Sequence, residues 1–139
     1  MVTINRFDGK YRFLSNFFNA PVEYKGLHYL NNEAAFQAQK CMNEQEKIQF
    51  TTIPPNIAKR LGRKVKLRPD WEIIKINIMK EIVEAKFTQN EDLKELLLET
   101  GDSILIEGNT WNDVFWGINI KTGNGSNNLG KILMQVRED

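Results

Sequence analysis

The sequence predicts an α+β fold, in which residues 1–139 form a single helix-rich domain with a small β-sheet. Residues 71–87 carry apolar side chains at helical spacing, and two short strand-like segments flank the turn-forming pair Lys25-Gly26. A chain of 139 residues, 41% of them hydrophobic, is long enough to bury one core.

The N-terminal part of the chain predicts a hairpin followed by a helix. Residues 22–24 and 27–29 form the two strands of the hairpin. Asn31 or Asn32 then caps a helix that runs to about Asn43, because a short amide side chain accepts the free N–H groups of a first helical turn.

The remaining elements follow from breakers and from periodicity. Prolines open helices and glycines end them, whereas a short run of β-branched and aliphatic residues favours a buried strand. The elements are, in order, a helix from Pro54-Pro55 to Gly62, helices over 71–87 and 91–99, a buried strand over 104–106, a glycine-rich loop over 121–127 and a helix over 129–137.

Charge and cysteine content exclude several classes of protein. The 19 basic residues nearly balance the 18 acidic ones, so the chain is no general polycation, although a local basic pocket is allowed. The single cysteine, Cys41, forms no disulfide within the chain, so we expect a cytoplasmic protein. No apolar run approaches membrane-spanning length. One Cys and one His cannot complete a zinc shell, and neither Walker nor Rossmann loop occurs, so we expect no metal and no cofactor.

A first group of chemically active residues lies in residues 31–40. On a helix, Glu33, Gln37 and Lys40 fall within about 60° of arc, opposite small apolar residues. Such a pattern is typical of a solvated face on an amphipathic helix. It also fits a catalytic face, because an amine held near apolar groups loses hydration, and a neutral lysine is a nucleophile.

A second group is the basic segment KRLGRKVKLR, residues 59–68, which holds six cations. It fits either an ordinary basic surface or a clamp for phosphate or diphosphate, since arginine matches phosphate oxygens with two donors. Arg63 is favoured for the clamp because it follows the break at Gly62.

A third group lies in EGNTWNDVFWGI, residues 107–118, where Glu107 and Asp113 flank Trp111 and precede Trp116. A carboxylate between two indoles suits a site in which a flat ring stacks while an acid or base moves a proton. Core tryptophans beside a solvated turn would give the same pattern.

Five blocks of the sequence together resemble the NADAR, or YbiA-like, family. They are FLSNF (13–17), EAAFQAQK (33–40), LGRKVKLRPDW (61–71), EGNTWNDVFWG (107–117) and NNLGKILMQVR (127–137). The resemblance implies a YbiA-like fold with a central cleft, and N-glycosidase activity that breaks a bond between ribose C1 and a nitrogen. It also implies that the lysine of the QxxK block, here Lys40, is catalytic. Ala34 stands where many members carry histidine, which affects a helper contact rather than the core chemistry.

The resemblance also implies a division of roles. Such bonds break through an oxocarbenium-like state, in which positive charge grows on C1. Glu33 either stabilises this charge or orients Lys40. Lys40 captures C1 and gives a Schiff base after the ring opens, while Asp113 handles the proton. The candidate substrate-binding residues are Asn16, Gln37, Arg63, Trp71, Glu107, Trp111, Trp116 and Gly117.

Three functions fit these residues. The first, and the leading one, is removal of ADP-ribose from guanine in DNA, with a transient DNA contact that the segment 59–68 favours. The second is the same cleavage on a small phosphorylated ribosylamino-pyrimidine of riboflavin synthesis, which the near-zero net charge favours. The third is a non-catalytic sensor of NAD or ADP-ribose. None of the three involves a membrane.

Overall fold

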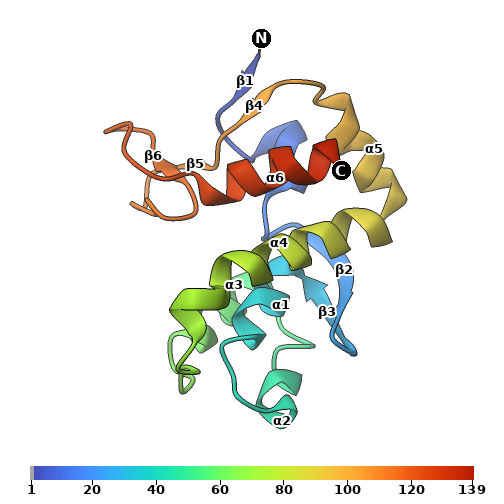
Figure 1. Cartoon of the computed structure of the whole chain (residues 1–139), viewed down its shortest axis with the longest axis vertical. Helices are drawn as coiled ribbons and strands as arrows, with labels where there is room; N and C mark the ends of the chain where they lie inside the picture. The colour runs from blue at the N-terminus through green and yellow to red at the C-terminus, as the bar shows by residue number, and fades with distance from the viewer. Residues whose placement is uncertain (1) are drawn as a thin grey trace. The chain divides into compact units, whose positions relative to one another are not determined.

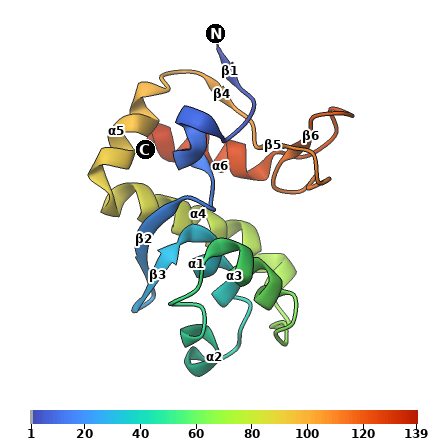
Figure 2. The same cartoon turned by 180° about the vertical axis from the view of Figure 1, so that it is seen from behind.

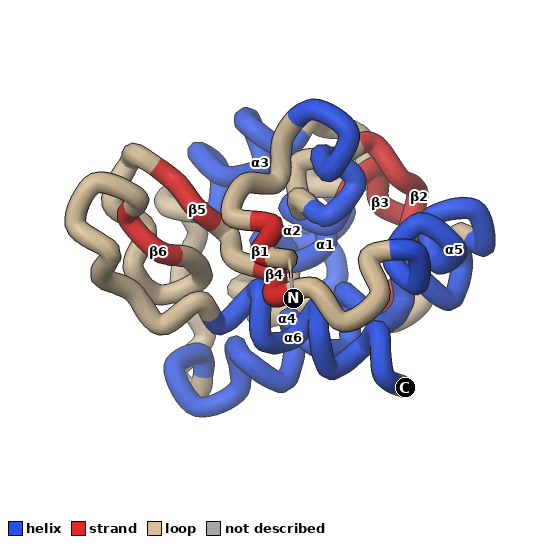
Figure 3. Tube along the Cα trace, turned by 90° about the horizontal axis from the view of Figure 1, so that it is seen from above, coloured by secondary structure: helices blue, strands red, loops and turns tan. Residues whose placement is uncertain are grey.

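The computed structural model describes residues 2–139, which divide into two compact units. One unit, Asn16–Glu91, contains Lys40 and is called the Lys40 unit. The other, residues 2–15 and 92–139, contains Asp113 and is called the Asp113 unit. Helix prevails over strand along the chain, which confirms the α+β class (Figure 3). The single domain and its central cleft stay predictions.

The Lys40 unit begins with the predicted hairpin. Strand β2 (Asn19–Tyr24) pairs antiparallel with β3 (Leu27–Asn31), and alternate side chains of β2 are buried. Lys25 and Gly26 both have positive φ, 50° and 87°, as the tight turn between twisted strands requires. Figure 2 shows the hairpin beside helix α1 (Asn32–Ala38), against which both strands pack.

Three further helices complete the Lys40 unit: α2 (Glu44–Ile48), α3 (Pro55–Gly62) and α4 (Trp71–Gln89). Helix α1 packs against α3 and α4, as Figure 1 shows. The prediction that α1 reaches Asn43 is wrong, since it ends at Ala38. The side chain of Asn43 accepts the N–H of Glu46 at 2.8 Å and so caps α2 instead.

Helix α4 is the long helix that its periodicity predicts, and its buried face contains Ile78, Met79, Ile82, Val83 and Phe87. Burial of this face against β2 and α1 stabilises the unit through removal of apolar surface from water. No helix within residues 2–139 combines the length and the apolar character needed to cross a bilayer.

The Asp113 unit contains two pairs of very short parallel strands. The unit comprises β1 (Thr3–Ile4), the 3₁₀ helix η1 (Gly9–Leu14), most of α5 (Glu91–Glu99), β4 (Ile104–Leu105), β5 (Gly108–Asn109), β6 (Ile118–Asn119) and α6 (Asn128–Glu138). Strand β1 pairs with β4, and β5 with β6. Within residues 2–139, the single small sheet of the prediction is therefore three two-stranded sheets, counting the hairpin. The strand expected over 104–106 is confirmed at Ile104–Leu105, although Ile104 is exposed.

Candidate functional site

The first turn of α1 is fixed by buried asparagines. Asn31 accepts the N–H of Ala34 at 2.7 Å through its side chain, which confirms it as the cap. The N–H of Glu33 donates to the backbone carbonyl of Asn16 at 3.0 Å. The side chain of Asn16 accepts from Asn32 and donates to the sulfur of Met79, both at 3.4 Å. Asn16, a predicted binding residue, is buried and supports the start of α1.

Glu33 and Gln37 form a buried pair one turn apart on α1. Gln37 Nε2 donates to Glu33 Oε2 at 2.6 Å, and the two side chains are only 7% and 8% exposed, respectively. This burial contradicts the interpretation of residues 31–40 as a solvated face. A carboxylate that accepts a short hydrogen bond away from water is held in one orientation.

Lys40 does not lie on α1, so the predicted helical face through Lys40 is wrong. It lies in the tight turn that follows, where its N–H donates to the carbonyl of Gln37 at 3.1 Å. Its own carbonyl accepts the N–H of Arg68 at 3.0 Å. These two bonds fix the backbone of Lys40 just beyond the buried pair on α1.

The side chain of Lys40 approaches the face of an indole. Its Nζ lies 6.0 Å from the ring centroid of Trp71, which is buried at the start of α4 and packs on Phe36 with centroids 5.0 Å apart. Trp71, a predicted binding residue, therefore forms a wall beside the amine.

The surroundings of Lys40 favour its neutral form. Burial lowers the pKa of Lys40 because the charged form loses hydration, and the positive charges of Arg63 and Lys75 lower it further. The charge of Glu33 acts in the opposite direction. An amine with a lowered pKa supplies a larger neutral fraction, which is the nucleophilic form.

The basic segment 59–68 is only partly free to meet a ligand. Arg68 pairs with Asp70 at 2.7 Å, and Lys59 lies over the ring of Phe17 at 5.8 Å. Arg60, Arg63, Lys64 and Lys66 are exposed. Arg63 is the first residue after α3, as predicted, and is the member of this segment whose charge acts on Lys40.

In the Asp113 unit, the buried Asn109 helps to organise the segment from Glu107 to Gly117. Asn109 Nδ2 donates to the backbone carbonyl of Asp113 at 2.9 Å and to Glu107 Oε2 at 3.1 Å. Asp113 Oδ1 accepts the N–H groups of Phe115 and Trp116 at 3.2 and 2.9 Å. The carboxylate of Asp113 thus closes a turn, which is a structural contact beside its predicted catalytic role.

Gly117 is needed where it stands, because it lies against Glu107. A Cβ at this position would lie 1.9 Å from Glu107 Oε2 and 2.1 Å from the Glu107 carbonyl oxygen. Trp116 is half-buried and meets Phe115 edge to face at 4.8 Å, whereas Trp111 is 62% exposed. Trp116 therefore packs within this segment, whereas Trp111 presents most of its surface to solvent.

Two residues that organise this segment were not identified from sequence. Asn109 is 2% exposed, and Asn127 adopts a left-handed φ of 52° while its Oδ1 accepts the N–H of Glu107 and its Nδ2 donates to the carbonyl of Leu105. The signal that points to them is the density of asparagine between residues 109 and 128, since Asn tolerates positive φ and bonds to nearby backbone.

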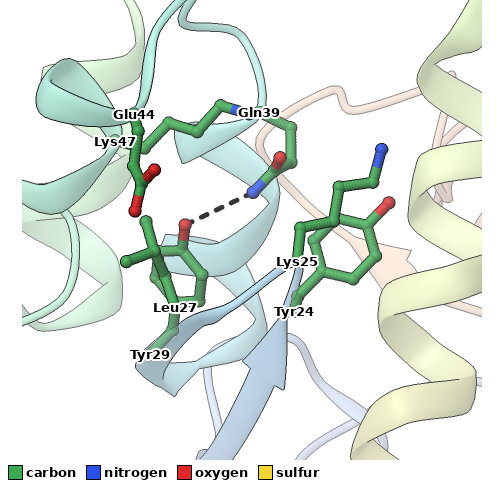
Figure 4. Close-up of a pocket in the computed structure, with 7 residues that line it drawn as sticks. All are labelled: Tyr24, Lys25, Leu27, Tyr29, Gln39, Glu44 and Lys47. Atoms are coloured by element: carbon green, nitrogen blue, oxygen red, sulfur yellow. Dashed lines mark hydrogen bonds between the residues drawn. The ribbon is translucent and has the colours of Figure 1, made fainter.

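A small cavity of about 80 Å³ also lies within the Lys40 unit (Figure 4). Its lining residues are Tyr24, Lys25, Leu27, Tyr29, Gln39, Glu44 and Lys47. The figure shows Gln39 donating to the hydroxyl of Tyr29, a bond of 3.4 Å. None of the predicted site residues lines this cavity, so it is separate from the chemistry of Lys40.

Comparison with known proteins identifies the family. A model of the NADAR domain matches residues 4–139. The chain belongs to the NADAR family. This confirms the resemblance carried by the five sequence blocks.

Curated relatives and a solved structure agree with this assignment. N-glycosidase YbiA of Escherichia coli is 38% identical over 127 residues, covering 89% of this chain and 78% of YbiA. N-glycosidase Npun_R5314 of Nostoc punctiforme is 37% identical over 93% of this chain and 85% of its own length. Riboflavin biosynthesis protein VVA0006 of Vibrio vulnificus is 38% identical over 95% of this chain, which spans 36% of that protein. The NMR structure of E. coli YbiA matches with a TM-score of 0.87 at 35% identity. The match covers 99% of this chain and 83% of the YbiA chain.

Proposed function

We propose that this NADAR chain is an N-glycosidase that cleaves a bond between ribose C1 and a nitrogen with Lys40 as nucleophile. The observation that carries the proposal is the placement of Lys40. Its amine is desolvated beside Trp71, next to a buried carboxylate that Gln37 holds in place. The names of the relatives YbiA and Npun_R5314 support the same reaction.

The chemistry proceeds in two stages. The neutral amine of Lys40 forms a bond to C1 as the C1–N bond of the substrate breaks, and the electron pair and a proton go to the departing nitrogen. Glu33 stabilises the positive charge that develops on C1. Opening of the sugar ring leaves a protonated Schiff base on Lys40. Water then adds to C1, and the free sugar aldehyde and the amine are released.

For the substrate, we propose a small phosphorylated ribosylamino-pyrimidine first. Two relatives, from Vibrio vulnificus and Zea mays, carry names of riboflavin biosynthesis proteins, and such a metabolite needs a single phosphate contact. We assign this contact to Arg63, because it is exposed and its positive charge lowers the pKa of Lys40.

A second substrate is ADP-ribose attached to guanine in DNA. The observation that favours it is the set of exposed cations Arg60, Arg63, Lys64 and Lys66 on or just after α3. Cations on an open surface suit a polyphosphate strand, and they predict cleavage that weakens as salt rises.

The test follows release of product from both substrates by mass spectrometry. Wild-type protein is compared with Lys40→Ala and with Lys47→Ala, a matched control whose pKa is also lowered by burial but which lines the separate cavity. We expect turnover by wild type and Lys47→Ala only. Reduction with borohydride during turnover should add the sugar to Lys40. Tight ADP-ribose binding without turnover on either substrate would support the sensor instead.

A further inference from the structure

The amide of Gln37 lies between the carboxylate of Glu33 and the backbone of Gly62. On one side, Gln37 Nε2 donates to Glu33 Oε2 at 2.6 Å. On the other side, a Cβ placed on Gly62 would lie 2.0 Å from Gln37 Oε1 and 2.7 Å from its Cδ. Gln37 and Gly62 are buried, so solvent does not fill the space between them.

The orientation of this amide gives Glu33 a hydrogen-bond donor but leaves the amide oxygen of Gln37 without one in the described part of the chain. Among residues 2–139, the structure gives Gln37 Oε1 no hydrogen-bond partner. A buried acceptor without a partner costs free energy, and proteins rarely retain one without a reason. The reverse orientation would set Oε1 against the carboxylate oxygen, and the two would repel. The observed arrangement therefore keeps a donor on Glu33, which stabilises the ionised carboxylate.

Gly62 is explained by space rather than by backbone conformation. It is the last residue of α3, and its φ is not positive, so an alanine would fit the backbone. Alanine is also the better helix former. The close approach of Gln37 is what excludes a methyl group here, because the methyl would displace the amide.

We propose that Gln37 is a positioning residue that fixes the carboxylate of Glu33 for the reaction at Lys40, and that Gly62 provides the room for it. This inference rests on the proposed N-glycosidase function. It replaces the earlier expectation that Gln37 binds substrate directly. A side chain at position 62 should then have the same effect as loss of the amide donor, because the atoms nearest to it would be those of Gln37.

The test compares Gln37→Met, which keeps the length without a donor, with Gly62→Ala and with the double variant. We expect kcat to fall about 10- to 100-fold in each single variant, with KM changed by about 3-fold or less, since loss of a hydrogen bond that supports a reacting group acts on its orientation. The double variant should lose no more than the worse single variant, because both changes remove one interaction.

A second measurement works without turnover, so that failure of the proposed function is told apart from failure of this inference. The side-chain carboxyl carbon of Glu33 is titrated by NMR in wild type, Gln37→Met and Gly62→Ala. Lys40, whose charge interacts with Glu33, and the charges Arg63 and Lys75 that act on Lys40 remain in all three proteins. We expect the midpoint to rise in both variants. An unchanged midpoint in variants whose circular dichroism is native, or kcat losses that multiply in the double variant, would overturn the proposal.

Discussion

Asn109 and Asp113 hold each other through two hydrogen bonds. Asn109 Nδ2 donates to the backbone carbonyl of Asp113 at 2.9 Å, and the N–H of Asp113 donates to Asn109 Oδ1 at 3.0 Å. The side chain of Asp113 then accepts from the two N–H groups at Phe115 and Trp116. The charge of Asp113 and its role as an acceptor can therefore be separated by mutation.

Asp113→Asn keeps an oxygen for these two N–H groups but removes the acid. We expect near-native stability, because the turn stays closed. If Asp113 handles a proton, turnover should fall about 100-fold or more. Asp113→Ala loses the acceptor as well and should cost about 1–3 kcal/mol of unfolding free energy. Urea denaturation and kcat are measured for both. Full turnover by Asp113→Asn would limit this residue to its structural contacts.

Gly117→Ala should destabilise the protein by about 1–3 kcal/mol, since a methyl group cannot fit between two oxygens of Glu107 without moving backbone. The measurement is the urea midpoint. Gly123→Asn serves as the control, because Gly123 has open space around it and asparagine tolerates its φ of 76°. Equal midpoints for the two variants would contradict the close packing of Gly117.

Sequence predicted the long helix and the hairpin but missed strands β1, β5 and β6. Helix α4 was predictable because its buried residues repeat at helical spacing over several turns, and the hairpin because Lys25-Gly26 sets its turn. Strands β1, β5 and β6 have two residues each, too few for any period to show.

The site shows the same limit. The residue types Glu33, Gln37 and Lys40 were identified, but the end of α1 depends on a competing cap at Asn43, which helical spacing ignores. The contact between Gln37 and Gly62 joins two helices through tertiary packing. No local pattern in the sequence predicts it.

The rate of cleavage should rise with pH as Lys40 loses its proton, with a midpoint below the ordinary lysine value of about 10.4. The charge of Arg63 disfavours protonated Lys40, so Arg63→Gln should let the proton persist to higher pH and move the midpoint upward. Lys64→Gln, at the exposed neighbouring position, is the control and should leave the midpoint in place. If Arg63→Gln left the midpoint unchanged, the charge of Arg63 would have no effect on the pKa of Lys40. A rise in KM for Arg63→Gln alone would separately support its contact with phosphate.

Lys86 offers a test of stability against pH. It is 1% exposed on α4, its Nζ lies 5.7 Å from the ring centroid of Phe18 and 5.2 Å from that of Phe87, and burial lowers its pKa to about 7. The unfolded chain binds this proton up to about pH 10.4, so between these values the unfolded state holds more protons than the folded state. The free energy of unfolding therefore rises with pH across this window. Below about pH 7 the burial of Lys86 destabilises the fold by its full amount.

Lys86→Met removes that cost while filling a similar volume. We expect the variant to be more stable than wild type by at least about 1 kcal/mol at about pH 6, with the difference narrowing toward about pH 10. Urea unfolding at several pH values measures it. Lys80→Met, on the same helix but with its side chain 32% exposed, should show no such narrowing. Parallel curves for wild type and Lys86→Met would mean that Lys86 keeps the same protonation in the folded and unfolded chain, because only a difference in bound protons gives a slope.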